Sequence, residues 1–175
     1  MIERLAGDDA DLIIENRWPQ DYDEDKVIAS ASHHRDVVAV AISVGAQPHL
    51  QAARAEATDA NAGMLADASA TRTAGHLRLA DNSTLRHRAI AEHLESFAGT
   101  IVSSKNQING AAQTFTSEWA KAPQLVSVNG WFQHDLNRYR SQLVDNGRAT
   151  VTAALEALTT AHRECSTALH GALDQ

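Results

Sequence analysis

Nine histidines are the residues of this 175-residue chain whose chemistry is most readily tested by spacing. A metal site on helices needs ligands three or four residues apart on one face, and di-iron bundles repeat a Glu-x-x-His pattern. The sequence contains no Glu-x-x-His, and the adjacent His33 and His34 point to different sides of a helix. His162 and Cys165 are three residues apart, but no matching pair stands on another helical segment. The sequence therefore predicts no metal site and no cofactor.

The serines and the cysteine do not form a recognisable catalytic nucleophile. Hydrolase serines stand on strained turns such as Gly-x-Ser-x-Gly, whereas Ser103, Ser104 and Ser117 fall inside or at the end of a predicted helix. The glycines stand singly, so no glycine-rich loop can cradle a phosphate. Cys165, the only cysteine, falls on an apolar stripe typical of a buried side chain, and a thiol that links two copies is the alternative. We therefore expect a protein that is not an enzyme.

Charge and composition argue against two further classes of function. The net charge is −7 and the basic residues are scattered, which disfavours nucleic-acid binding. No apolar run approaches the roughly 20 residues of a membrane helix, and the first residues do not resemble a cleaved signal peptide. The chain is therefore expected to be made in the cytoplasm, with no nucleic-acid partner and no membrane span.

Long helices must position any functional surface of this chain. In its second half, apolar residues recur at alternating steps of four and three, a period that keeps one side of a helix against a partner helix. The first run is Ile90, Leu94, Phe97, Ile101, Ser104, Ile108, Ala111 and Phe115, and the second is Val151, Leu155, Leu158, His162, Cys165, Leu169 and Ala172. The pattern predicts an all-α protein without strands, an elongated antiparallel bundle of about four long helices. Its predicted core residues are Leu94, Phe97, Ile101, Ile108 and Leu158.

The sequence predicts a single helical domain over residues 1–175. Residues 1–22 are expected to be an irregular lead-in with at most one short helical turn. Residues 23–79 are expected to form a first helical hairpin, and residues 84–173 a second one. Whether the chain breaks or continues as a helix around Asp81–Ser83 stays open.

The first predicted hairpin contains helices at about 23–44 and 48–79. Gly45 and Pro48 are expected to form its tight reversal, since glycine favours helix ends and proline the first helical turn. The apolar stripe of the first of these helices is Val27, Ala31, His34, Val38 and Ala41, widened by Val37, Val40 and Val44.

The second predicted hairpin joins a helix at about 84–121 to one at about 131–173 through a loop at 121–130. Asn146-Gly147 is expected to kink the last helix or to change its register, because the apolar stripes on either side do not join smoothly.

Three tryptophans lie at or beside predicted helix ends in a chain with only 5% aromatic residues: Trp18, Trp119 and Trp131. They either close the ends of a thin bundle or dock a partner, because large aromatic side chains are common interface anchors. Trp119 and Trp131 flank the same predicted loop and are expected to be close in space. We therefore predict that any partner surface lies at this end of the second hairpin, with Trp18 as a further docking candidate.

The segment Trp18-Pro19-Gln20-Asp21-Tyr22-Asp23-Glu24-Asp25-Lys26, followed by an alanine- and valine-rich helix, carries a family resemblance. It is similar to the opening of the WXG100-like N-terminal domains of large actinobacterial proteins exported by type VII (ESX) secretion. Thr116-Ser117-Glu118-Trp119, at the end of a long predicted helix, resembles the hairpin turn of that family. The chain departs from the family pattern at three points. The glycine of the first motif is missing, and Asp21 and Tyr22 stand there instead. Ala120 and Lys121 follow Trp119 in place of the Trp-x-Gly triplet, and no acidic residue stands four positions after a tyrosine.

The resemblance implies a non-enzymatic helical module for secretion, targeting or protein interaction in the type VII (ESX) system. Such a module pairs with a helical protein partner or forms a homo-oligomer, contacts type VII components, and is secreted or held at the cell envelope. The missing tyrosine–acid pair keeps a second function open, a cytoplasmic helical scaffold or chaperone-like adaptor. A metal-binding four-helix bundle is the third and least favoured alternative.

Overall fold

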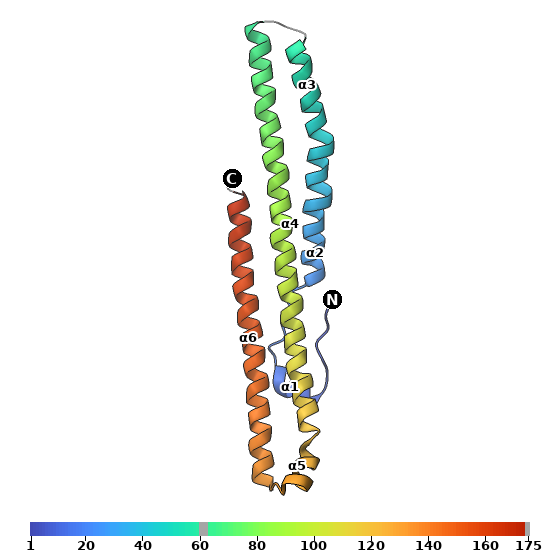
Figure 1. Ribbon diagram of the computed structural model, residues 1–175, viewed down its shortest axis with the longest axis vertical. Helices are drawn as coiled ribbons and strands as arrows, with labels where there is room; N and C mark the ends of the chain where they lie inside the picture. The colour runs from blue at the N-terminus through green and yellow to red at the C-terminus, as the bar shows by residue number, and fades with distance from the viewer. Residues whose placement is uncertain (60–62, 174–175) are drawn as a thin grey trace. The chain divides into compact units, whose positions relative to one another are not determined.

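The computed structural model describes residues 1–59 and 63–173, and every regular element among them is helical (Figure 1). The elements are α1 (Asp8–Ile14), α2 (Glu24–Ser32), the π-helical turns η1 (His33–Val38) and η2 (Ala41–Ala46), α3 (Gln47–Asp59), α4 (Met64–Trp119), α5 (Ala122–Asn129) and α6 (Gln133–Leu173). The first part of α4 runs antiparallel to α3, and its last part runs antiparallel to the start of α6. The predicted all-α class, built from helical hairpins, is confirmed.

The chain divides into two compact units. Unit 1 contains Met1–Asp25 and Phe97–Glu164, and unit 2 contains Lys26–Ser96 and Cys165–Gln175. Both α4 and α6 pass from one unit into the other, so each unit is formed from segments that are distant in the sequence.

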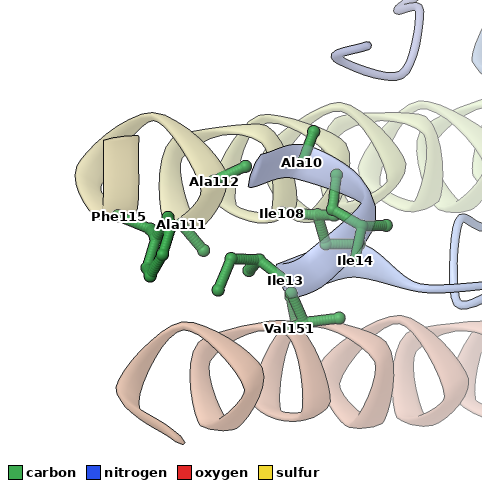
Figure 2. Packing of buried hydrophobic residues seen from close by; sticks show 9 residues of the cluster. Ala10, Ile13, Ile14, Ile108, Ala111, Ala112, Phe115 and Val151 are labelled. Atoms are coloured by element: carbon green, nitrogen blue, oxygen red, sulfur yellow. The ribbon is translucent and has the colours of Figure 1, made fainter. Parts of the chain in front are cut away.

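The core of unit 1 lies where α1 packs between α4 and α6 (Figure 2). Ile13 and Ile14 of α1 are fully buried, and they meet Ile108 of α4 and Val151 of α6. Burying a side chain of this size stabilises a fold by about 1.5–3 kcal/mol relative to leaving it exposed. Phe97, Ile101, Ile108 and Leu158 are buried as predicted, while Leu94 is half-buried.

Residues 1–22, predicted as an irregular lead-in that can hold a short helical turn before Trp18, contain the seven-residue helix α1. Three aspartates occupy its first turn, where carboxylates interact favourably with the positive end of the helix dipole. A helix this short is marginal in isolation, so burial of its apolar side against unit 1 stabilises it. Periodicity cannot detect such a helix, because the pattern covers fewer than two full turns.

Gly147 allows α1 to approach α6 closely. A Cβ atom at this position would lie 3.0 Å from two side-chain carbons of Ile13, closer than ordinary van der Waals contact. The helix α6 runs without interruption from Gln133 to Leu173. Gly147, which was predicted to mark a kink or a change of register, also makes room for a packed side chain.

The predicted reversal at Gly45 and Pro48 is wrong. Helical structure continues from α2 through η1 and η2 to the end of α3 at Asp59, and α4 begins at Met64 and runs back beside α3. Proline lacks an N–H donor and crowds the carbonyl four residues before it. The π-turn η2 ends just before Pro48, and its closing hydrogen bond joins Gln47 N–H to Ile42 O, five residues back. This wider turn accommodates the proline without a break. Residues 60–62 of the predicted helix 48–79 lie outside the described residues.

The two π-turns also explain why the predicted widening of the apolar stripe is wrong. Val37, Val40 and Val44 are exposed, with 54%, 45% and 71% of their surface accessible. A π-turn contains one more residue than an α-turn, so each rotates the residues after it about the helix axis. The prediction assumed an unbroken period of 3.6 residues, and that period does not hold across η1 and η2.

The helix α4 continues through Asp81–Ser83, so of the two alternatives that the sequence left open the continuous helix is the one observed. Asp and Asn inside a helix are only about 0.7 kcal/mol less favourable than alanine, which is too little to interrupt a long packed helix. The side chain of Asp81 also accepts a hydrogen bond from the Gln47 side chain of α3.

The predicted loop 121–130 contains a helix, α5. Pro123 stands in its first turn, where a missing N–H leaves no helical bond unmade. Gly130 ends the helix in the left-handed conformation, with a φ angle of 66°, and its N–H donates to Val126 O. Proline and glycine at these two ends are the normal signals of a helix.

Candidate protein-docking surfaces

Trp18 lies beside a buried ion pair of unit 1. Its ring is half-buried against the core, and the Lys105 ammonium of α4 lies 5.9 Å from its centroid. That ammonium donates to Glu24 Oε2 at 2.6 Å, and both charged side chains are only 3% exposed. The pair thus connects the start of α2 to α4, and Trp18 covers it. Whether Trp18 also docks a partner stays a prediction.

The Glu24 carboxylate is held charged by several donors. Burial raises its pKa, but hydrogen bonds from Lys105 and from the backbone N–H groups of Glu24 and Ile2 outweigh burial, so the pKa is lowered overall. Buried charges persist only when their hydrogen-bonding capacity is satisfied in this way. Trp18 and Glu24, two residues of the segment Trp18–Lys26, therefore have a structural role in unit 1.

Trp119 and Trp131 lie on either side of α5, and both are half-buried. Trp119, the last residue of α4, packs on the core of unit 1, and the Arg140 guanidinium lies 5.9 Å from its ring. Trp131 meets Tyr139 edge to face, with ring centroids 5.5 Å apart. Each indole thus packs against a residue of α6 and presents only part of its surface to solvent.

A polar network closes the same hairpin end. The Tyr139 hydroxyl donates to Glu118 Oε2 at 3.4 Å, and Lys121 Nζ donates to Glu118 Oε1 at 2.6 Å. The Lys121 ammonium lowers the pKa of Glu118 and keeps it charged. These contacts hold the end of α4 against α6. The helix α5 begins three residues after the end of α4, so its starting point is held in place.

The most exposed apolar side chains at this end are three that the sequence analysis did not select. They form what we call the hairpin-tip patch: Val126, Val128 and Phe132, with exposures of 41%, 80% and 71%. Exposed apolar residues that lie close together in the sequence at one end of a hairpin are a candidate interaction site. Apart from His134, no ionisable side chain stands between Lys121 and Asp135, and this gap in charge was the available sequence signal.

The backbone that carries Phe132 is fixed. Its N–H donates to Asp135 Oδ2 at 3.0 Å, the bond by which the third residue of a helix caps the residue at its start. The Phe132 ring lies nearly parallel to that of His134, with centroids 6.1 Å apart. An exposed aromatic on a fixed backbone loses little freedom when it binds a partner.

Unit 2 contains a pair of stacked histidines, His34 from η1 and His87 from α4. Their rings are 5.1 Å apart, and the two Nδ1 atoms are separated by 2.9 Å. One ring must donate and the other accept, so at least one must have an unprotonated Nδ1. Burial, followed by the charges of His87 and His33, lowers the pKa of His34.

The remaining candidate chemistry is metal binding by His, Cys, Asp and Glu side chains and nucleophilic catalysis by Cys165. Over residues 1–59 and 63–173, no group of three or more His, Cys, Asp or Glu side chains could hold a metal ion. Cys165 is buried as predicted, its thiol lies 3.7 Å from the His93 carbonyl oxygen, and burial raises its pKa. A thiol in this state is a poor nucleophile. In the described part of the chain, no helix is both long enough and apolar enough to cross a membrane.

Comparisons of the chain with protein-family models, with curated proteins and with solved structures find no match.

Proposed function

We propose that this chain is a non-enzymatic protein-interaction module that serves secretion or targeting in a type VII (ESX) system. The hairpin-tip patch carries the proposal, because it places an exposed Phe132 and Val128 on a fixed backbone at one end of a helical hairpin. The partner is a helical protein, whose apolar side chains would cover these residues. The family assignment draws on the segment Trp18–Lys26 and on the long helix ending at Trp119.

The arrangement of unit 1 supports a scaffold role. Its core and its buried Glu24–Lys105 pair make a rigid base, and Trp18 and Trp119 pack on that base. Interface hot spots are commonly exposed aromatics surrounded by groups whose positions are already set. In the hairpin-tip patch Phe132 has the exposure for this role, while Trp119 and Trp131 are half-buried.

A cytoplasmic scaffold or chaperone-like adaptor is the second candidate. The observation in its favour is that Tyr22 and Tyr139 are followed four positions later by Lys26 and Leu143, so the tyrosine–acid export pair is missing. The two candidates share the docking surface and differ only in whether the chain leaves the cell.

The docking test is co-purification of the tagged chain with the products of its neighbouring genes. The double variant Val128→Ser/Phe132→Ser should lose most of the captured partner, since truncating one interface anchor weakens binding by about 2 kcal/mol or more. A matched control, Val37→Ser/Val44→Ser, removes two exposed valines of unit 2 and should capture as the unmodified chain does. Melting temperatures should stay similar for all three. Unchanged capture by the Val128→Ser/Phe132→Ser chain would contradict the proposal.

Export is measured separately. In an actinobacterial host, the chain should appear in the culture medium or cell envelope, and disabling the type VII ATPase should abolish its appearance. Retention in the cytoplasm with intact partner capture would favour the adaptor function.

A further inference from the structure

Four arginines of α4 in unit 2 stand apart from the ion pairs formed among the described residues. They are Arg72, Arg78, Arg86 and Arg88, and none forms an ion pair with a described residue. By contrast, Arg35 of the same unit pairs with both Asp36 and Glu95. This stretch of α4 is therefore a local basic surface in a chain whose net charge is −7.

Arg86 is the most unusual of the four. Its Nε atom is buried and has no hydrogen-bond partner among the described residues. Buried donors are normally satisfied, and a guanidinium is best satisfied by a carboxylate that accepts two of its N–H groups. The Nε atom itself is closed to solvent, so an anionic group from outside the chain can meet only the outer N–H groups of this half-buried side chain.

A groove of about 630 Å³ surrounds this arginine, entirely within unit 2. From α4 it is lined by Leu85, Arg86 and His93, and from α6 by Ala168, Gly171 and Ala172. Among the described residues that line it, none is a carboxylate. The small residues of α6 allow a close approach, and Leu85, 62% exposed, offers an apolar contact.

The same side of α4 continues towards its N-terminus. Leu79 and Arg72 stand seven and fourteen residues before Arg86, a spacing that keeps side chains on one face of a helix. Leu79 is 66% exposed and Arg72 is exposed. The described end of α6, at Leu173, lies beside the middle of α4 and does not reach this part of the face (Figure 1).

We propose that this face of α4, from Arg72 to Arg86, binds an amphipathic acidic helix of a partner protein. The inference rests on the proposed function and names the partner's chemistry. Leucines of the partner would cover Leu79 and Leu85, and its flanking glutamates or aspartates would pair with Arg72 and Arg86. The two arginines are roughly 21 Å apart along the axis, so the partner helix needs about four turns.

Charge complementarity and the exposed leucines favour an acidic amphipathic helix over a second copy of the chain or a nucleic acid. A second copy of the chain would need an exposed acidic helix of this length. The acid-rich α1 is too short, because it has seven residues and packs its apolar side into unit 1. A nucleic acid would satisfy the arginines but would leave Leu79 and Leu85 uncovered, and apolar burial is the larger part of most helix-in-groove binding.

The test uses the full chain and two labelled helical peptides of about 18 residues, four to five turns. Both carry leucines at heptad spacing, one flanked by glutamates and the other by lysines. Fluorescence anisotropy should show binding of the glutamate peptide, weakened by salt, and much weaker binding of the lysine peptide. Equal binding of both peptides, or no binding of the glutamate peptide, would overturn the proposal.

Variants locate the site. Arg72→Gln/Arg86→Gln should weaken the glutamate peptide by about tenfold or more, and Leu79→Ser should also weaken it. Arg138→Gln, which removes an exposed arginine of unit 1, is the matched control and should bind normally. Circular dichroism should show equal helicity and melting for all variants. An effect of Arg138→Gln equal to that of the α4 double variant would mean that net charge alone drives binding, which also overturns the proposal.

Two further measurements separate this proposal from its rivals and from the proposed function. Self-association that Arg72→Gln/Arg86→Gln abolishes, measured by analytical ultracentrifugation, would make the occupant a second copy. If a single-stranded DNA 20-mer binds as tightly as the glutamate peptide, this face of α4 binds polyanions in general and the proposal of an acidic helix is wrong. If the Val128→Ser/Phe132→Ser chain loses its cellular partner but binds the peptide normally, both proposals stand. If it captures the partner normally, only the hairpin-tip proposal fails.

Discussion

The two units bury different side chains and leave different ones exposed. All of the largest fully buried side chains lie in unit 1: Ile13, Ile14, Ile101, Ile108, Phe115, Val151 and Leu158. Unit 2 buries mainly alanines, together with Ile90 and Cys165, and it exposes Ile28, Val40, Val44, Leu79 and Leu85. Because stabilisation scales with the apolar area removed from water, unit 1 should be the stable scaffold. Unit 2 should open more readily. Its exposed apolar side chains can contact a partner.

The largest expected effect comes from breaking the buried ion pair of unit 1. Lys105→Met leaves Glu24 charged and buried without its cation, which should cost about 3–5 kcal/mol of unfolding free energy. The double variant Glu24→Leu/Lys105→Met should recover most of this loss, because no buried charge remains. Urea denaturation followed by circular dichroism measures both. A loss below about 1 kcal/mol for the single variant would show that the pair is solvated, as exposed pairs are.

The same pair predicts how stability depends on pH. In the unmodified chain the lowered pKa of Glu24 means that its contribution is present above its ordinary value of 4.5 and is lost as pH falls below it. In the Lys105→Met chain the donor that outweighs burial is gone, so the pKa should be raised instead. The deficit of that variant should therefore shrink as the pH is lowered.

The apolar contrast predicts unequal effects of truncation. Ile101→Ala in unit 1 removes a fully buried side chain and should cost about 2–5 kcal/mol. Val40→Ala in unit 2 removes one that is 45% exposed and should change stability by no more than about 0.5 kcal/mol. Equal losses at the two positions, measured by chemical denaturation, would remove the distinction between scaffold and open face.

Alanine substitutions at two glycines, one in each unit, should change the free energy of unfolding in opposite directions. Gly147→Ala in unit 1 would place a methyl group 3.0 Å from Ile13 and should cost about 1–3 kcal/mol. Gly75→Ala in unit 2 meets no atom within 4 Å and should stabilise α4 by about 0.4–1 kcal/mol, since alanine restricts the unfolded chain. Thermal melts of the two variants should shift in opposite directions, and shifts of the same sign would contradict this account.

The smallest expected effect is a response of unit 2 to acid. Because the pKa of His34 is lowered, the folded state disfavours its protonation, and stability should fall as pH drops below the ordinary value of 6.5. Amide hydrogen exchange in α2 and η1 should therefore be faster at about pH 5.5 than expected from intrinsic rates, relative to about pH 7.5. His34→Gln should remove most of this difference. Exchange in residues 97–119 of α4 serves as the internal control.

Sustained heptads made the fold class and much of the core predictable. Ile101, Ile108 and Leu158 are buried because one unbroken period holds along α4 and α6, and knobs on one helix must meet holes on another. Where the backbone leaves that period, prediction failed. Val44 is exposed because η1 and η2 each add a residue, and whether a turn becomes π-helical depends on packing that composition does not reveal.

The candidate sites were predictable in part. The tryptophan positions led to a predicted docking surface at this hairpin end, but the exposed apolar side chains there are Val126, Val128 and Phe132, which follow no helical period. The lone Arg86 could not be identified from sequence, since its neighbours in the groove come from α6, more than 80 residues later. Whether a charged side chain has an ion-pair partner can be recognised only from the positions of the described residues around it.

The rate at which Cys165 reacts can report how often unit 2 opens. This cysteine is the only thiol in the chain, and it is enclosed in unit 2 beside the His93 carbonyl. A thiol-specific dye can react only when that enclosure opens, so the labelling half-life of the unaltered chain reads out opening events without any introduced probe. Ligands that occupy the adjacent groove would lengthen that half-life in proportion to their occupancy, which gives a direct screen for molecules that bind there.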